Sequence, residues 1–593
     1  MVRRRYLVFL WGAGDDAAER AVMRHLEALE AGGAWRRDFV EAGWALAVEV
    51  GTALSIRRLT PGRGVILGDL YPMSDAEAPP EPRIALPGDL RTSRQVLHEL
   101  TRRFWGRYVA LHQSAASEAV AGLRDPSGAV ECLTWRKDRL RIVASHLPTE
   151  RPELLPEKLG VDWDAVLQRL GNSAALASGV ALSGLEALDA GEMMDLKTAE
   201  RAMIWTPAAF VGSRREPIDI LRERLRARVD QVVGAHARQA GAIVAELSGG
   251  LDSAVVAGAL QATGAGKVAQ WVNFHTADPE GDERRFARAV AAHLGLALVE
   301  VAKTELELTE AHLAVVGAGL RPSTLGVDYE QDEDNGARCA AVGADTLITG
   351  MGGDAVFFQT QSPLIAADAL RAGLSGPALF RVFRDVAEMR RDSVWAVARA
   401  GVVGAFGHAP LRRTPPYLLK GIIRRAPRGP VHPWLSDLTK VAPGKQLQIH
   451  ALTAALLFHG HSRRGLAVDL VHPLLSQPLV EWVLSVPTFD LAFGSNDRAL
   501  AREAFADRLP PEVLRRRSKG DLLAYYGRMV SRSLGLVRPY LLDGLLVREG
   551  LVERAFLEEA LTAESLLWRD LAMGLIELLA VEAWARRWQG AGR

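Results

Sequence analysis

The stretch Glu246-Leu-Ser-Gly-Gly-Leu-Asp-Ser253 indicates how the central part of this chain folds. A short apolar run, residues 242–247, leads into it and is typical of a buried strand, and residues 253–262 continue with an apolar helical pattern. Two adjacent glycines, Gly249 and Gly250, permit a tight turn and a close approach of the backbone to a ligand. Since the free N–H groups at a helix start attract anions, the segment predicts a phosphate-binding loop.

The polar side chains of this segment predict a nucleotide that is held together with a divalent cation. Ser248 and Ser253 offer hydroxyl donors, whereas Asp252 would repel phosphate unless a cation such as Mg²⁺ lies between them. The loop is not of the Walker type, because no Gly-Lys-Ser/Thr follows. The alternative is a Ser/Gly turn that only caps a helix. The agreement of strand, loop and helix favours the binding loop.

A second glycine-rich segment, Leu347-Ile-Thr-Gly-Met-Gly-Gly-Asp354, also follows a buried apolar run. Ligands of parallel α/β sheets bind at the carboxyl ends of the strands, which is where such a turn would lie. Asp354 is therefore the candidate for a second metal ligand. The segment alone is a weak signal, but together with the first segment it predicts one site.

Strand and helix patterns alternate around both segments. This alternation favours a parallel α/β sheet with crossover helices in the second part of the chain. The first ~210 residues instead carry short strands separated by Gly, Pro and Asp, and a polar junction lies at 211–217. We therefore expect two domains, 1–210 and 217–593, the second mostly helical from residue 363 onward. The expected strands are 45–50, 64–68, 140–145, 242–247, 268–274, 297–301 and 346–349, and the expected helices are 218–238, 253–262, 282–294 and 336–342.

Composition excludes several classes of protein. Apolar residues make up 48% of the 593, and 72 Lys+Arg balance 71 Asp+Glu, so nothing indicates a nucleic-acid partner. The two cysteines, Cys132 and Cys339, form neither a disulfide framework nor a Cys-rich metal site. The apolar run after the first arginines is too short for a signal peptide and is expected to be a strand. No run approaches a membrane span. We expect a cytoplasmic protein without a membrane partner.

The segment Ser248-Gly-Gly-Leu-Asp-Ser253 resembles the pyrophosphate loop of the adenine-nucleotide α-hydrolases, and both glycine-rich segments together resemble the asparagine synthetase superfamily. Further similarity lies in residues 106–112 and 122–128, in His472-Pro-Leu-Leu, and in residues 498–502 and 510–519. The resemblance implies an α/β fold in two parts. A degenerate Ntn-type, glutaminase-like αββα domain would be followed by an α-hydrolase-like parallel sheet with helical additions.

Two departures from the superfamily pattern bear on the reaction. Glutamine-hydrolysing members expose a nucleophilic cysteine at the mature N-terminus, whereas this chain starts Met1-Val-Arg-Arg and its first cysteine is Cys132. We therefore expect no glutaminase and an amine that comes from the substrate. Three residues before Asp354, β-lactam synthetases carry a tyrosine and asparagine synthetases usually a glutamate, but here Met351 stands. The segment is most similar to that of lasso-peptide macrolactam cyclases.

The resemblance to these cyclases implies a reaction and a set of site residues. ATP would adenylate a side-chain carboxylate of a precursor peptide, and the peptide's N-terminal amine would close a macrolactam with release of AMP and pyrophosphate. A leader-binding protein and a leader protease are the implied partners. Lys519 would steady charge during acyl transfer, although an ordinary surface cation is the alternative. Asp252 and Asp354 would hold Mg²⁺, and the nucleotide would lie on Leu247, Ser248, Gly249, Gly250, Ser253, Gly350 and Gly353, with Leu247 and Gly350 against the adenine.

Several points stay open at the level of sequence. The general base for the amine is unassigned, and Glu388, Asp385, Glu333, Asp282 and Glu283 are only candidates. His459 and His461 are interpreted as structural residues, and the basic stretch 411–428 as a solvated loop rather than a docking site. The alternatives are an asparagine synthetase, a β-lactam-synthetase-like ligase on a small substrate, and a non-catalytic scaffold with the same fold.

Overall fold

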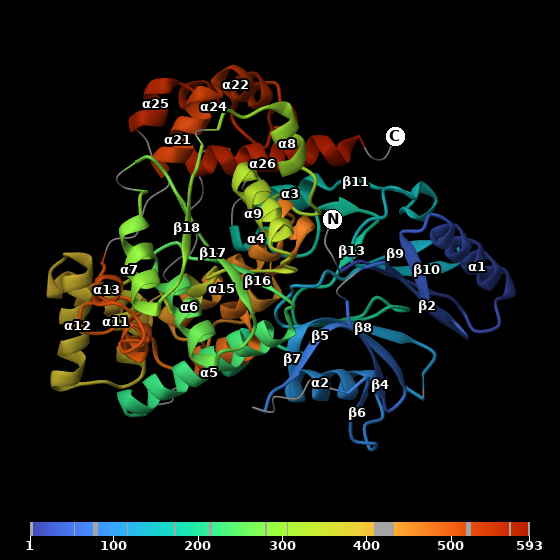
Figure 1. Cartoon of the computed structure of the whole chain (residues 1–593), viewed down its shortest axis with the longest axis horizontal. Coiled ribbons are helices and arrows are strands. Elements are labelled where there is room, and N and C mark those ends of the chain that lie inside the picture. The colour runs from blue at the N-terminus through green and yellow to red at the C-terminus, as the bar shows by residue number, and fades with distance from the viewer. Residues whose placement is uncertain are drawn as a thin grey trace.

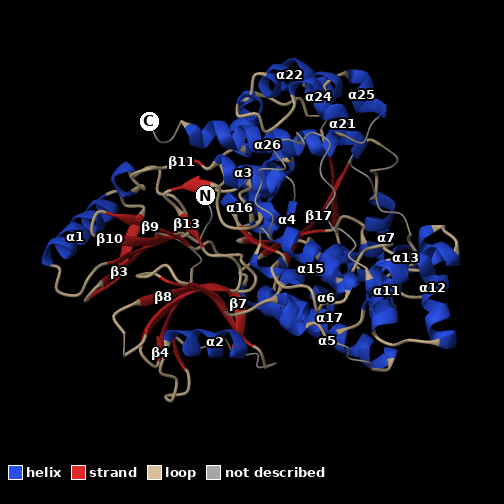
Figure 2. Cartoon of the chain, turned by 180° about the vertical axis from the view of Figure 1, so that it is seen from behind, coloured by secondary structure: helices blue, strands red, loops and turns tan. Residues whose placement is uncertain are grey.

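The computed structural model describes the chain except for residues 1–3, 52–53, 75–80, 116, 171–172, 213–215, 279–280, 305, 408–431, 518–522, 569–570 and 591–593. A strand-rich part, blue to cyan in Figure 1, lies beside a larger part in which helices surround a central sheet. Figure 2 shows the same division from behind, with most strands gathered on the N-terminal side. The basic stretch 411–428 and Lys519 lie outside the described residues. The domain limits 1–210 and 217–593 stay a prediction.

Two sheets build the strand-rich part. One has the strand order β13-β9-β10-β1-β3-β2 and the other the order β15-β14-β8-β7-β5-β4-β6. Their pairings are antiparallel except for β4 with β6. The strands are β1 (Tyr6–Leu10), β2 (Trp35–Glu41), β3 (Trp44–Glu49), β4 (Ile56–Thr60), β5 (Arg63–Pro72), β6 (Arg83–Ala85), β7 (Phe104–Gln113), β8 (Val120–Arg124), β9 (Leu133–Lys137), β10 (Leu140–Ala144), β13 (Glu186–Ala187), β14 (Glu192–Asp195) and β15 (Arg201–Met203).

The period-two pattern of strand β1 explains how these sheets stack. Tyr6 and Val8 pack with residues of β5 and β7 from the other sheet, whereas Leu7 and Phe9 face α1 (Asp16–Ala31). On the far side, α2 (Ser93–Arg103) packs on the second sheet. The layers are therefore helix, sheet, sheet and helix, which confirms the predicted αββα arrangement. A small pair, β11 (Gly160–Val161) and β12 (Leu182–Ser183), and helices α3 (Trp163–Leu170) and α4 (Ser173–Leu176) complete this part.

The central sheet of the second part has five strands in the order β18-β17-β16-β19-β20, and all of its pairings are parallel. Ile243 and Ala245 of β16 face the core that holds α5 and α6, and Val244 faces Cys339 of α9 on the opposite side. The predicted parallel α/β sheet is thus confirmed. The elements are α5 (Ile218–Gln239), β16 (Ile243–Glu246), α6 (Leu251–Thr263), β17 (Val268–His275), α7 (Arg284–Leu294), β18 (Leu298–Ala302), α8 (Glu310–Val316), α9 (Tyr329–Ala341), β19 (Thr346–Ile348) and β20 (Asp469–Val471).

Strand β20 is absent from the elements expected from sequence. It has only three residues and precedes His472-Pro, so it offers no periodicity that would distinguish it from a loop. The rest of the described chain after residue 363 is mostly helical, as predicted. Helix α10 (Gly353–Val356) precedes this region. The helices after residue 363 are α11 (Leu364–Arg371), α12 (Gly376–Arg390), α13 (Val394–Phe406), α15 (Pro443–Ala455), α16 (Arg463–Ala467), α17 (Gln477–Ser485), α18 (Thr488–Leu491), α19 (Ala499–Ala504), α20 (Pro511–Leu514), α21 (Leu523–Arg532), α22 (Leu534–Leu542), α23 (Leu545–Arg548), α24 (Arg554–Ala560), α25 (Ala563–Trp568) and α26 (Ala572–Gln589).

Within the described residues, no helix is both long enough and apolar enough to cross a bilayer.

A buried cluster of four charges joins the two parts. Nη2 of Arg4 lies 2.7 Å from Asp69 and 2.9 Å from Asp469, and Nη2 of Arg107 lies 2.8 Å from Asp469 and also contacts Asp69. Burial alone would raise the pKa of Asp69 and of Asp469, but the two arginines outweigh it and hold both pKa values below the usual range. Because Asp469 belongs to β20, the cluster connects the two stacked sheets of the strand-rich part, which we call the sandwich, to the edge strand of the central sheet.

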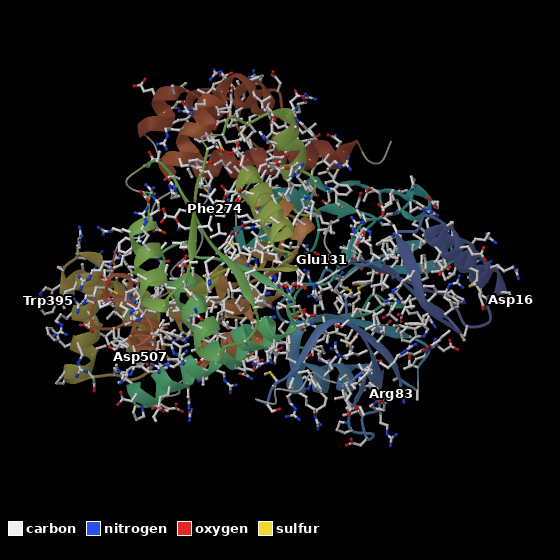
Figure 3. All side chains as sticks on the ribbon, viewed as in Figure 1. Asp16, Arg83, Glu131, Phe274, Trp395 and Asp507 are labelled. Atoms are coloured by element: carbon white, nitrogen blue, oxygen red, sulfur yellow. The ribbon has the colours of Figure 1, made fainter. Side chains whose placement is uncertain are left out.

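Replacing Asp469 by Asn should destabilise the protein by about 3–5 kcal/mol, because the two buried charges of Arg4 and Arg107 would then share Asp69 as the one carboxylate left in the cluster. Chemical denaturation at neutral pH measures this difference. The matched control is Asp507→Asn at the surface pair with Arg226, a 2.6 Å contact in which the Asp507 side chain is 62% exposed (Figure 3). That change should cost about 0–1 kcal/mol.

The effect of Asp469→Asn should also depend on pH. Both aspartates have lowered pKa values in the folded state, so the cluster stabilises above the unfolded value of about 3.9 and loses this contribution as the pH falls through the folded values. Equal denaturation midpoints for the two variants, or a difference that grows in acid, would contradict this account of the interface.

Candidate functional site

The first glycine-rich loop leaves the carboxyl end of β16 and enters α6. Gly249 has a φ of +89°, and a Cβ there would lie 2.7 Å from the carbonyl oxygen of Glu283, so only glycine fits. Within the loop, the hydroxyls of Ser248 and Ser253 lie 2.9 Å apart, and the N–H of Gly250 donates to Ser248 Oγ at 3.3 Å. As Gly250 is the N-cap of α6, the helix begins without a capping side chain. This geometry suits an anion at the helix start.

The second glycine-rich loop, which follows β19, presses against the first. A Cβ at Gly350 would lie 2.5 Å from the backbone nitrogen of Ser253, and one at Gly353 would lie 2.5 Å from Cβ and Cγ of Asp252. Gly352, with a φ of +90°, makes the turn into α10. The loops predicted to form one site therefore touch through their backbones.

Arg498 draws the two predicted metal ligands together. Its Nη1 lies 3.3 Å from both carboxylate oxygens of Asp252 and 3.0 Å from Oδ1 of Asp354. The side-chain amide of Gln359 also faces the carboxylate of Asp354. Sequence reasoning did not assign Arg498 to the site. The signal was present in its position at the head of the family-like stretch 498–502, but only the fold shows that this stretch reaches the loops.

Both loops border a cavity of about 650 Å³. At one end the cavity is polar, with the loop residues, Glu283, Arg498 and Arg516. The rest of the wall, which we call the apolar end, comes from α4, α15, α26 and the segment before α9; it is largely apolar but includes Glu577, Ser323 and Thr324. The apolar end is lined by Leu176, Leu325, Ala451, Ala454, Ala455, Leu457, Phe458, Ala580 and Val581.

Arg516 supplies a second cation at the polar end. Its guanidinium pairs with Glu283 and lies 4.0 Å from the ring centroid of Phe286, and Nη1 is 3.4 Å from the carbonyl oxygen of Gly249. The arginine therefore contacts the first loop at Gly249, and its side chain is only 9% exposed. It belongs to the same basic stretch as the predicted Lys519, which lies outside the described residues.

Met351 occupies the wall of the cavity beside a buried ion network. Its sulfur lies 3.5 Å from Nη2 of Arg464, and Nη1 of that arginine lies 3.0 Å from Oε1 of Glu246. Arg464 also pairs with Asp332 at 3.2 Å. Burial raises the pKa of Asp332 to about 6, although Arg464 opposes the shift. The thioether thus lies among charged groups but cannot accept a proton from an amine.

The structure brings most of the predicted nucleotide-binding residues together. Ser248, Gly250, Asp252, Ser253, Gly350 and Asp354 line the cavity. Gly249 instead packs against the backbone at Glu283, and Gly353 packs against the side chain of Asp252. Leu247 differs, because its side chain is fully buried in the core, so only its backbone could contact a nucleotide.

The candidate bases fall into two groups. Glu283 lines the cavity, and so do Glu246 and Glu577, which the sequence did not suggest. Asp385, Glu388 and Glu333 do not line it: they bind Gly494, Ser495 and Arg463, respectively. Asp282 is held by a hydrogen bond from Arg284, which lowers the pKa of this carboxyl to about 2.

The carboxylate pair fits a magnesium ion that is shared with a nucleotide. Among the residues that the structure describes, no group of three or more His, Cys, Asp or Glu side chains could hold a metal. Two carboxylates beside a phosphate loop are instead the protein share of a typical Mg²⁺–nucleotide site, in which phosphates and water complete the coordination. Asp252 and Asp354 would therefore hold the ion.

The thiol of Cys132 is unsuited to nucleophilic attack. Cys132 is fully buried between the two sheets of the sandwich, and burial raises the pKa of its thiol to about 12. Cys339, the other cysteine of the chain, is also buried. Neither side chain therefore offers an accessible thiolate.

Comparison with known proteins gives one family. A family model described as Asparagine synthase matches residues 224–586, more than half of the chain. No curated protein matches. Among solved structures 25 chains match. One of them is the U34-tRNA thiolase NcsA from Methanococcus maripaludis with its 4Fe-4S cluster, with 15% identity, a TM-score of 0.20, and coverage of 42% of this chain and 82% of that chain.

Replacing Gly353 by Ala should weaken nucleotide binding at least about tenfold, because the new methyl group would displace the side chain of Asp252. Titration of a fluorescent ATP analogue with Mg²⁺ measures the affinity. Gly535→Ala is the matched control, since a Cβ at Gly535 meets nothing within 4 Å. Unchanged affinity in a folded Gly353→Ala protein would show that the contact between the loops does not position the nucleotide.

Proposed function

We propose that this chain, which belongs to the asparagine synthase family of ATP-dependent, AMP-forming carbon–nitrogen ligases, uses that reaction to cyclise a peptide. In this proposal the enzyme adenylates a side-chain carboxylate of a precursor peptide. The N-terminal amine of the same peptide then displaces AMP and closes a macrolactam, as in lasso-peptide biosynthesis.

The observation that carries the proposal is the division of the cavity into two unlike halves. Asp252, Asp354 and the glycine-rich loops suit a nucleotide at the polar end, and small or apolar side chains of α15 and α26 line the other end. A small polar substrate such as aspartate would need fixed polar partners throughout its pocket. An apolar wall that includes Ala451, Ala454 and Ala580 instead suits the side chains of a peptide.

Met351 supports the choice of branch. The position three residues before Asp354 carries a tyrosine with a base role in the β-lactam synthetases and usually a glutamate in the asparagine synthetases that this chain resembles. Here its side chain is a thioether 3.5 Å from Arg464, so it performs neither role. The amine must therefore lose its proton to another group.

The first chemical step follows from the arrangement of the polar end. An oxygen of the peptide carboxylate attacks the α-phosphorus of ATP, the bond to the β-phosphate oxygen breaks, and pyrophosphate leaves. The leaving pyrophosphate acquires negative charge. The N–H groups at the start of α6 would stabilise this charge, together with the guanidinium groups of Arg498 and Arg516. Mg²⁺ bound to Asp252 and Asp354 would neutralise part of the same charge.

The second step forms the amide. The amine nitrogen attacks the acyl carbon, the bond to AMP breaks, and the amine proton passes to a carboxylate among Glu246, Glu283 and Glu577, the glutamates that line the cavity. The walls contribute by holding the amine against the acyl carbon, since proximity replaces an encounter in solution. Lys519 would steady the charge on the acyl oxygen, as the family resemblance implies.

We place the reaction in the cytoplasm, with a leader-binding protein and a leader protease as partners. This assignment follows from the proposed substrate, because a ribosomal precursor must lose its leader before its amine is free to react. No nucleic acid and no membrane enter the proposal.

Replacing Asp252 by Asn should abolish AMP formation and leave the fold intact, because the amide keeps the size of the side chain but removes its charge. AMP release in the presence of ATP, Mg²⁺ and peptide measures the reaction, and circular dichroism checks the fold. AMP production at the wild-type rate by this variant would refute the assignment of Asp252 as a metal ligand.

The substrate class is tested by mass spectrometry of a leader-free candidate peptide from the same gene neighbourhood after incubation with enzyme, ATP and Mg²⁺. Loss of one water from the peptide, with stoichiometric AMP, is the expected result. AMP without a dehydrated peptide would leave an adenylating ligase that acts on another acceptor. No AMP, and no ATP–pyrophosphate exchange, across a panel of such peptides would overturn the proposed reaction.

A further inference from the structure

A second cavity lies where the sandwich meets the helical part. It has a volume of about 240 Å³, and we call it the basic chamber. Its wall combines residues from both parts, and Glu131, labelled in Figure 3, marks the junction. Five arginines and one glutamate are its only Arg, Lys, Asp or Glu lining residues within the described chain, namely Arg4, Arg5, Arg124, Arg321, Arg587 and Glu131.

The chamber concentrates buried hydrogen-bonding groups that have no partner among the described residues. Nη1 of Arg4, Nε of Arg5 and Nε of Arg321 are buried donors without an acceptor. Nε2 of His459, which also lines the chamber, is buried without a hydrogen-bond partner, and Nε2 of His146 lies 3.9 Å from Glu150. One nitrogen of a neutral imidazole is an acceptor, so these two atoms do not call for an acceptor as the guanidinium nitrogens do. Since almost all buried polar groups in proteins find a partner, the three orphaned guanidinium nitrogens around one cavity indicate a missing acceptor.

Ion pairs within the protein neutralise part of the positive charge of the chamber arginines, but they leave the guanidinium nitrogens named above without an acceptor. Arg321 pairs with Glu131 through its two terminal nitrogens, which leaves Nε over. Among the residues that the structure describes, Arg5 pairs with Glu49 and Glu150 at 3.7 and 3.8 Å from Nη1, which is too far for hydrogen bonds. Arg4 is 5% exposed and still keeps one terminal nitrogen unpaired.

The chamber adjoins the nucleotide cavity. Ser323 and Leu457 line both, and helix α26 borders both, with Glu577 in the first and Arg587 in the second. Ten residues of helix span about 15 Å, which corresponds to about four or five residues of an extended peptide. A single elongated substrate can therefore reach from one cavity to the other.

We propose that the basic chamber is a second subsite that binds a carboxylate of the same substrate while another carboxylate is activated at the nucleotide. The inference rests on the proposed function, and it adds that the peptide carries a second acidic group, at a separation from the activated one that lets it reach the neighbouring chamber. A carboxylate provides two oxygens that accept several charge-assisted hydrogen bonds from arginine. It would supply the acceptor that Arg4, Arg5 and Arg321 lack.

The test uses the full chain and succinate as a probe dicarboxylate, with binding measured by isothermal titration calorimetry. The wild-type protein should bind succinate at one saturable site, both with and without α,β-methylene-ATP in the nucleotide cavity. Arg5→Met should weaken binding about tenfold, because one charge-assisted partner is lost. Arg321→Lys, which keeps a positive charge for Glu131 but removes Nε, should weaken it to a similar extent.

Arg141→Met is the matched control. Arg141 is a half-buried arginine of the sandwich that donates to the carbonyl of Leu196 and does not line the chamber. Thermal unfolding establishes that each variant folds. Succinate affinity equal to wild type in folded Arg5→Met and Arg321→Lys proteins, or no saturable binding to the wild type, would overturn the inference. Displacement of succinate by α,β-methylene-ATP would do so too, because the anion would then lie in the nucleotide cavity.

The same measurements separate this inference from the proposed reaction. Succinate binding needs no turnover, so Asp252→Asn should retain it while losing AMP formation. Arg5-dependent binding in a protein that forms no AMP would support the chamber and reject the reaction. AMP and macrolactam formation without succinate binding would support the reaction and reject the chamber.

Discussion

The site depends on one steric constraint, the contact between the backbones of two glycine-rich loops. Gly350 and Gly353 lie so close to Ser253 and Asp252 that no side chain fits between the loops. This contact sets the ends of β16 and β19 side by side and brings the carboxylates of Asp252 and Asp354 to one nitrogen of Arg498. The geometry of the loops, the proximity of Asp252 to Asp354 and the polar end of the cavity all follow from it.

Charge is organised around this contact by long-range partners. Arg498 and Arg516 come from the last hundred residues of the chain and lie against loops formed some 150 to 270 residues earlier. Because both cations are almost fully buried, they act in a medium of low polarity, where a compact anionic group is strongly attracted. The wall from α15 and α26 is largely apolar, with Glu577 as a charged residue among its small side chains, so the two parts of the cavity differ in polarity.

Local patterns predicted much of this molecule. The apolar runs at β16, β17, β18 and β19, the helical pattern of α5 and α6, and the glycine pairs were readable because each is a feature of consecutive residues. Strand β20 was not, since three residues carry no period. Arg498 and the basic chamber were not, since they depend on which distant segments meet. Likewise the sequence could not show that the side chain of Leu247 is buried in the core, while Lys519 stays a prediction.

The buried charges between the sandwich and the central sheet have a genetic consequence. Asp469 is three residues from His472, whose Nδ1 lies 2.7 Å from the hydroxyl of Thr349, the residue directly before the second loop. A substitution of Arg4 or Arg107 would therefore disturb contacts that lead through Asp469 and His472 to the second glycine-rich loop, although both arginines belong to the strand-rich part. In a screen for loss of activity, alleles of the sandwich would appear together with alleles of the glycine loops. Selection would therefore preserve the sandwich as a structural support for the second loop, whether or not the sandwich had a catalytic activity of its own.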